Sequence, residues 1–134
     1  MHIIPAKTII EEGIGAQSLS MELSAANIAN AHTTKTDQGG PYQRQVLTFE
    51  SYLPSPTSQA SSVRPKVSVD KTPGIQVYQP HHPHADATGN VEMPNVSILQ
   101  EKVNLMSASK TYEALATCFG QGVKLVQNLL NMVR

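Results

Sequence analysis

The residues best suited to chemistry lie in the segment QPHHPHADATGN (79–90), which places His81, His82 and His84 within four positions. Asp86 follows closely. Imidazole and carboxylate groups are common zinc ligands, so this cluster could hold a metal ion. A zinc site, however, needs three or four ligands that converge on one point, and one of them usually comes from elsewhere in the chain.

The spacing favours a turn over a metal site. His81 and His82 are adjacent, so their side chains diverge in an extended segment, and the neighbouring prolines stiffen the backbone. Asp86 is suited to accepting hydrogen bonds from nearby backbone N–H groups, and Gly89 is free to take a positive φ. We therefore expect no metal and no other cofactor. Metal analysis of the purified protein distinguishes a metal site from a turn.

Motifs of enzymes are not found elsewhere in the sequence. The serines do not lie in a G-x-S-x-G motif, and the GIG at 13–15 lacks the third glycine of a dinucleotide site. The single cysteine, Cys118, excludes a disulfide within the chain and a Cys-based zinc site. We expect Cys118 to be a small buried side chain and the protein not to be an enzyme.

Composition narrows the class of protein. The 134 residues suffice for one ordinary domain, and 10 basic residues balance 10 acidic ones, so a nucleic-acid partner is not expected. No segment has the ~20 apolar residues that span a bilayer, which argues against membrane insertion. Glu11 and Glu12 interrupt the N-terminal apolar stretch, so we expect no cleavable signal peptide.

Both ends of the chain have the apolar periodicity of long helices. The helix expected over about 6–31 has one seam at Ile10, Ile14, Met21, Ile28 and Ala31, and a second stripe at Ala16, Leu19, Leu23 and Ala26. A helix with two apolar stripes must meet more than one neighbour. The glycines at 13, 15, 120 and 122 indicate either a helix break or close approach of packed helices.

The second helix is expected over about 95–133, with Asn95 as its N-cap. Its seam repeats at alternating spacings of four and three, as in a coiled coil: Ile98, Lys102, Leu105, Ser109, Tyr112, Ala116, Phe119, Val123, Val126, Leu130 and Val133. A further stripe consists of Leu99, Val103 and Met106. Surfaces beyond those that two helices can bury against each other need partners.

The middle of the chain is rich in proline, and its pattern predicts a small β element. Strands are expected at 42–50 and 63–69, and the polar segment 54–62 is expected to be a mobile linker. Pro73 and Gly74 are the residues that a type II turn prefers. Such a turn would bring 75–78 back as a strand that pairs with 63–69. The expected fold is thus mainly α with a β insert: a helical domain of 1–34 and 95–134 that packs as a coiled coil, and an insert of 35–94 with a mobile linker near 51–62.

Four segments carry a family resemblance. AANIANAHTTKT (25–36) and GGPYQRQ (39–45) resemble the signature of flagellar axial proteins, while HPHADATGNVEMPNV (82–96) and VNLMSASKTYEA (103–114) are similar to the FlgC family of proximal rod proteins. The matching motif residues are Asn27, Ile28, Ala29, Asn30, His82, Pro83, Asp86, Gly89, Pro94 and Asn95. His81 and His84 depart from the family, which more often has glycine and aspartate there.

The resemblance implies a structural subunit of the bacterial flagellar basal-body rod that transmits torque from the rotor ring toward the distal rod and hook. It also implies export through the flagellar type III apparatus and assembly in the periplasm. The implied partners are other copies of the chain, neighbouring rod proteins of the FlgB and FlgF type, FliE and the MS-ring protein of the rotor.

The two ends of the chain then supply the candidate assembly interface: Ile14, Met21, Ile28, Ile98, Leu105, Tyr112, Phe119, Val123, Val126 and Leu130. Two alternatives stay open. One is another flagellar axial subunit, such as a different rod or hook protein, which position in the filament would distinguish. The other, less favoured, is a metal-binding protein that uses the histidine cluster.

Overall fold

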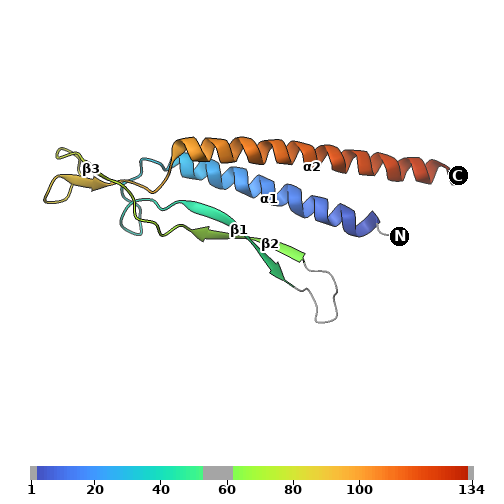
Figure 1. Cartoon of the computed structure of the whole chain (residues 1–134), viewed down its shortest axis with the longest axis horizontal. Helices are drawn as coiled ribbons and strands as arrows, with labels where there is room; N and C mark the ends of the chain where they lie inside the picture. The colour runs from blue at the N-terminus through green and yellow to red at the C-terminus, as the bar shows by residue number, and fades with distance from the viewer. Residues whose placement is uncertain (1–2, 53–61, 133–134) are drawn as a thin grey trace.

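The computed structural model describes residues 3–52 and 62–132 of the chain. Two long helices form its two ends, with two short antiparallel hairpins between them (Figure 1). In chain order the elements are α1 (Ile3–Ala29), β1 (Gln45–Tyr52), β2 (Ser62–Val69), β3 (Gln76–Tyr78), β4 (Asn90–Glu92) and α2 (Ile98–Met132). The prediction of long terminal helices around a small β region is confirmed.

The helices α1 and α2 lie side by side and run in opposite directions, so both chain ends lie at the same end of the molecule (Figure 1). Gly13 of α1 faces Leu115 of α2, since a Cβ placed on Gly13 would lie 3.3 Å from Leu115 Cδ1. Toward the other end of the pair, Asn27 contacts Glu101. Both helices continue through their glycines, so Gly13 marks a close approach and not a break.

The apolar core is small. Its fully buried members in the described ranges are Ala16, Leu23, Ala31, Val91 and Ala108. Because most of these side chains are short, the two helices approach closely but cover little apolar surface. Large side chains consequently stay exposed on both helices and on the first hairpin; they include Ile9, Phe49, Leu99, Met106, Leu125 and Met132.

The seam predicted for α2 is not the surface that this helix buries most. Leu105, Phe119 and Val126 on the seam are half-buried, but its exposed members include Lys102, Ala116, Val123 and Leu130. The fully buried residues of α2 are Glu101 and Ala108. A straight helix of 3.6 residues per turn drifts away from a strict 3.5-residue seam, and an apolar pattern does not register a buried carboxylate. Val133 lies outside the described residues.

The start of α2 also differs from the prediction. The helix begins at Ile98, and Ser97 is its cap, because the Ser97 Oγ accepts a hydrogen bond from the Gln100 N–H at 3.4 Å. The prediction of Asn95 as the N-cap is therefore wrong. The Asn95 side chain is engaged with the β region instead, as described below. Similarly, Cys118 is exposed, so the prediction that it is buried is wrong.

The expected strands at 42–50 and 63–69 correspond to β1 and β2, which pair as an antiparallel hairpin. The expected pairing of 75–78 with β2 is wrong, because β3 pairs with β4. Gly74 does not have the positive φ that a type II turn requires. It is needed for a close approach: a Cβ there would lie 1.7 Å from the Met93 carbonyl oxygen. Of the predicted linker near 51–62, residues 53–61 lie outside the described ranges, and the remainder belongs to β1 and β2.

The elements form layers along the helix pair. Helix α1 lies between α2 and the β1–β2 hairpin, while the β3–β4 hairpin projects at the end opposite the chain termini (Figure 1). The segments between the layers converge where α1 ends and α2 begins. Over 3–52 and 62–132, neither helix is long and apolar enough to cross a membrane.

Candidate functional site

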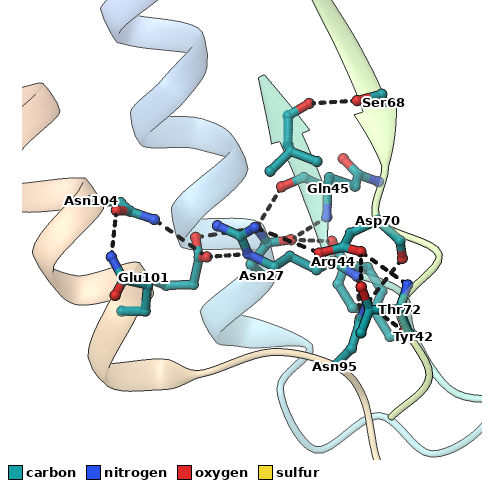
Figure 2. A network of polar contacts seen from close by, with 12 residues as sticks. Asn27, Tyr42, Arg44, Gln45, Ser68, Asp70, Thr72, Asn95, Glu101 and Asn104 are labelled. Atoms are coloured by element: carbon teal, nitrogen blue, oxygen red, sulfur yellow. Dashed lines mark hydrogen bonds and ion pairs between the residues drawn. The ribbon is translucent and has the colours of Figure 1, made fainter. Parts of the chain in front are cut away.

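Asn27, in the last complete turn of α1, is 1% exposed and connects three elements. Its Oδ1 accepts hydrogen bonds from the Tyr42 hydroxyl and the Gln45 N–H, both at 2.9 Å. Its Nδ2 donates to the Gln45 carbonyl oxygen at 2.8 Å and to Glu101 Oε2 at 3.2 Å. These four bonds use the full capacity of a side-chain amide, so Asn27 fixes β1 and α2 to the end of α1 (Figure 2).

Glu101, in the first turn of α2, is also 1% exposed. A buried carboxylate is costly unless it is paired and hydrogen-bonded. Glu101 Oε1 accepts a bond from Arg44 Nε at 2.7 Å and a longer one from Asn104 Nδ2 at 3.5 Å, and Oε2 accepts from Asn27 (Figure 2). Both carboxylate oxygens are therefore held by donors from other elements or from the next turn of the helix.

Arg44 and Asn95 extend the network to the base of the first hairpin. The Arg44 N–H donates to Asn95 Oδ1 at 2.7 Å, and the Arg44 carbonyl oxygen accepts from the Asp70 N–H at 2.8 Å. Asn95 Nδ2 in turn donates to the carbonyl oxygens of Asp70 at 2.9 Å and Thr72 at 3.0 Å. The segment before α2 is thus tied to the start of β1 and to the end of β2.

Hydrogen bonds and burial shift the pKa values of two members of this network. The hydroxyl and the backbone N–H of Thr72 hold the pKa of Asp70 below its ordinary value, with a smaller contribution from Arg44, whose Nη1 lies 3.8 Å from Asp70 Oδ2. Burial raises the pKa of the Tyr42 phenol, and the negative charge of Glu101 raises it further. Asp70 therefore stays ionised and Tyr42 stays neutral, which lets the Tyr42 hydroxyl donate to Asn27.

We refer to Asn27, Tyr42, Arg44, Asp70, Asn95 and Glu101 as the polar junction. Its two carboxylates, Asp70 and Glu101, accept hydrogen bonds from other residues of the same chain, and both lie close to the Arg44 guanidinium. These contacts hold the elements together. The polar junction joins the ends of both helices to the base of the β1–β2 hairpin. Its chemistry is that of a structural clamp.

The histidine cluster lies away from the polar junction, in the connection between β3 and β4. The His84 N–H donates to His82 Nδ1 at 3.1 Å, and the two rings meet edge to face with centroids 5.3 Å apart. His84 Nδ1 also lies 2.8 Å from the Thr34 hydroxyl. Among the residues that the structure describes, His, Cys, Asp and Glu side chains do not form a group of three or more that could hold a metal ion.

Asp86 makes the turn chemistry predicted from the sequence. Its Oδ1 accepts bonds from the Thr88 N–H at 2.8 Å, the Thr88 hydroxyl at 2.7 Å and the Asn90 N–H at 2.9 Å. These bonds, that of the Thr88 hydroxyl first, lower the pKa of Asp86. Gly89 has a φ of 81°, and a Cβ there would lie 2.8 Å from Tyr78 Cε2, so both space and backbone conformation require glycine.

Comparison with known proteins gives the family. No family model matches the chain. The flagellar basal-body rod protein FlgC of Borreliella burgdorferi is 30% identical over 152 residues, covering 100% of this chain and 99% of the relative. FlgC of Salmonella typhimurium is 37% identical over 116 residues, with 85% of each chain covered. FlgC of Aquifex aeolicus is 34% identical over 122 residues, covering 89% of this chain and 88% of the relative.

The chain belongs to the FlgC family of flagellar basal-body rod proteins. Members of this family are structural parts of the rod, so the protein is a structural subunit of the bacterial flagellar basal body. The function predicted from the sequence resemblance is confirmed at this level.

The residues carried over from the FlgC motif separate into two places. Asn27 and Asn95 both belong to the polar junction, and Pro94, which precedes Asn95, is buried. Asn30 donates to the Ala26 carbonyl oxygen at 2.9 Å at the end of α1. The other members form the β3–β4 connection described above: His82, Pro83, Asp86 and Gly89. These motif residues therefore fix turns and junctions of the fold.

Four members of the polar junction were not predicted as site residues from the sequence: Tyr42, Arg44, Asp70 and Glu101. A carboxylate in the first turn of a strongly amphipathic helix was the available signal for Glu101. Its partner Arg44 lies 57 residues away and could not be assigned from spacing.

The candidate assembly residues of this FlgC-family chain are distributed over both helices. Those that are half-buried in the single chain are Ile14, Met21, Ile28, Ile98, Leu105, Phe119 and Val126. Those that are exposed are Tyr112, Val123 and Leu130. Their role in contacts between subunits stays a prediction.

Proposed function

We propose that the protein is a subunit of the proximal rod and carries torque from the rotor ring toward the distal rod and hook. The observation that carries this proposal is the polar junction. A subunit that transmits torque must resist rotation of its outer part relative to its inner part. The four bonds of Asn27 and the buried pair of Glu101 with Arg44 supply that resistance at the point where the parts meet.

In this proposal the subunit has two parts. Residues 1–34 and 95–134 form the axial core, in which the terminal helices of many subunits pack as coiled coils, and residues 35–94 form the outer part. Support comes from the exposed apolar side chains in the second half of α2 (Leu125, Leu129 and Leu130), which the described part of the chain leaves uncovered. Large exposed apolar stripes on a helix call for neighbouring helices.

The neighbours in this proposal are other copies of the chain, rod proteins of the FlgB and FlgF type, FliE and the MS-ring protein. The subunit travels through the flagellar type III export apparatus and assembles in the periplasm. A small apolar core supports that route, since a chain that buries few large side chains unfolds at low cost.

The test is complementation of a bacterium that lacks this chain. Val123→Asp adds a charge to an exposed candidate interface residue, and Gln127→Asp, a polar residue one turn further along α2, is the matched control. We expect Val123→Asp to leave the level of the protein unchanged but to abolish swimming and rod completion, whereas Gln127→Asp swims. Normal swimming with Val123→Asp would contradict the assembly role of the helix.

A further inference from the structure

The β1–β2 hairpin has one apolar face. Residues opposite each other on paired strands point to the same side of a sheet. Leu47 is opposite Val67, and Phe49 is opposite Pro65, so these four side chains share one face. Val69 extends the same face. Phe49 is 54% exposed, and Val67 and Val69 are exposed as well, whereas Leu47 is half-buried, so the described chain leaves most of this surface uncovered.

The other face of the hairpin is mainly polar, with Val46 as its apolar member. Lys66 Nζ donates to Glu50 Oε1 at 2.6 Å across the strands, and the Thr48 hydroxyl donates to the Lys66 carbonyl oxygen at 3.1 Å. This polar face is compatible with exposure to solvent. A two-stranded sheet is marginal by itself, and covering its apolar face against another element would stabilise it.

A second uncovered apolar surface lies on α2. Leu99, Val103 and Met106 are all exposed, with Leu99 at 76%. At roughly 100° of rotation per residue, these three side chains point about 140–200° away from the side of Glu101 and Ala108, which faces α1. They therefore form an outer stripe on the side of α2 turned away from the rest of the chain.

The apolar face of the hairpin and the outer stripe of α2 have similar lengths, and both start next to the polar junction. The outer stripe spans about 10 Å at a rise of ~1.5 Å per residue, and the hairpin face spans about 13 Å from Pro65 to Val69 at ~3.3 Å per residue. Both surfaces begin beside the polar junction, since Val69 directly precedes Asp70 and Leu99 closely precedes Glu101. They occupy the two outer layers of the molecule, with α1 between them (Figure 1).

We propose that the apolar face of the β1–β2 hairpin in one copy packs against the Leu99–Val103–Met106 stripe of the next copy. One chain supplies both halves of this contact, so a second copy is sufficient to cover both. A contact between two different surfaces of identical subunits repeats from copy to copy, which produces a helical array when the rotation does not close a ring. The inference rests on the proposed function, because it requires copies to stand side by side in the rod.

Disulfide trapping in assembled rods tests this contact. Two differently tagged forms are produced in the same cells, one with Val67→Cys and the other with Val103→Cys, both with Cys118→Ser to remove the native exposed thiol. Basal bodies are isolated and treated with copper-phenanthroline as the oxidant. We expect a disulfide-linked dimer that carries both tags, since the Cα atoms must come within about 7 Å for the bond to form.

Lys66→Cys paired with Val103→Cys is the matched control, because Lys66 neighbours Val67 but points to the polar face. It should give far less dimer. Equal trapping from both faces, or a link to a different rod protein in place of the mixed-tag dimer, would overturn the inference. Absence of the chain from basal bodies would instead contradict the proposed function, so the two failures are distinguishable.

A pair of charges gives a second measurement if the cysteine variants assemble poorly. Val67→Glu and Val103→Lys should each reduce swimming at least several-fold, and the double variant should recover a clear part of it, since the new charges would face each other. Thr48→Glu on the polar face should swim normally. A double variant no better than the worse single variant would overturn the proposed contact.

Discussion

The side-chain amide of Asn27 donates to Glu101 Oε2 at 3.2 Å across a sequence separation of 74 residues. The last complete turn of α1 is thereby joined to the first turn of α2, and both residues are 1% exposed. The Asn27 side chain also makes two hydrogen bonds with the backbone of Gln45. The same side chain therefore sets the direction in which the β1–β2 hairpin leaves the helix pair.

Asn27→Ala should destabilise the isolated chain by about 2–3 kcal/mol. The change removes four hydrogen bonds and leaves buried partners on Gln45 and Glu101 without them. Asn30→Ala is the matched control. It removes a bond within the end of α1 and one to Thr33, so its effect should stay below about 1 kcal/mol. Urea unfolding followed by circular dichroism measures both, and equal effects would contradict the role of Asn27.

Arg44→Met should cost more than Glu101→Leu, because the first change leaves a carboxylate buried without its cation. Breaking a buried pair in this way costs about 3 kcal/mol or more. Glu101→Leu leaves Arg44 with part of its side chain in solvent and with Asp70 nearby. The double variant should be more stable than the sum of the single losses by at least ~1 kcal/mol. Additive losses in a double-mutant cycle by urea unfolding would show that the pair is not coupled.

Low pH should loosen the β3–β4 connection. The pKa of Asp86 is lower in the folded chain than its ordinary value of about 3.9, so its ionisation stabilises the fold above that value. That stabilisation is lost as the pH falls through the folded pKa. Asp86→Asn keeps an acceptor oxygen but has no proton to gain, so the acid transition of the Thr88 and Asn90 amide signals should disappear in an NMR titration. An unchanged transition would exclude Asp86 as its cause.

Gly74→Ala should disrupt the second hairpin. Its new Cβ would lie 1.7 Å from the Met93 carbonyl oxygen, so the backbone must move and the bond from the Met93 N–H to the Ile75 carbonyl oxygen is lost. Gly15→Ala is the contrasting variant, since no atom lies within 4 Å of its Cβ position. In the isolated chain it should stabilise α1 by up to about 1 kcal/mol. Thermal unfolding compares them, and a stable Gly74→Ala chain would contradict the close approach.

The sequence predicted the helices well because their apolar residues repeat over many turns, and it predicted the Asp86–Gly89 turn because that chemistry is local. It failed where the deciding partner was distant. Asn95 looked like a helix cap, but its amide satisfies backbone groups of Arg44 and Asp70, and Ser97 caps the helix. Glu101 lies outside the predicted apolar seam of α2, yet it is the most buried described residue of that helix and pairs with Arg44.

The pairing of short strands shows the same limit. The segment 75–78 carries no feature that distinguishes β2 from β4 as its partner, and the choice depends on how the chain between them folds. Gly74 looked like a turn glycine because proline precedes it, whereas its true constraint is the carbonyl of Met93, which comes from a distant part of the sequence.

The proposed rod subunit has its helix pair in the axial core and residues 35–94 in the outer part. A cryo-EM map of basal bodies from the organism that makes this FlgC-family chain is the test. We expect density for α1 and α2 at the inner radius of the rod, the β3–β4 hairpin at larger radius, the β1–β2 hairpin beside α2 of the neighbouring copy, and an intact polar junction. The β3–β4 hairpin at the inner radius with the helices outside it, or a rod without this chain, would contradict the proposed function.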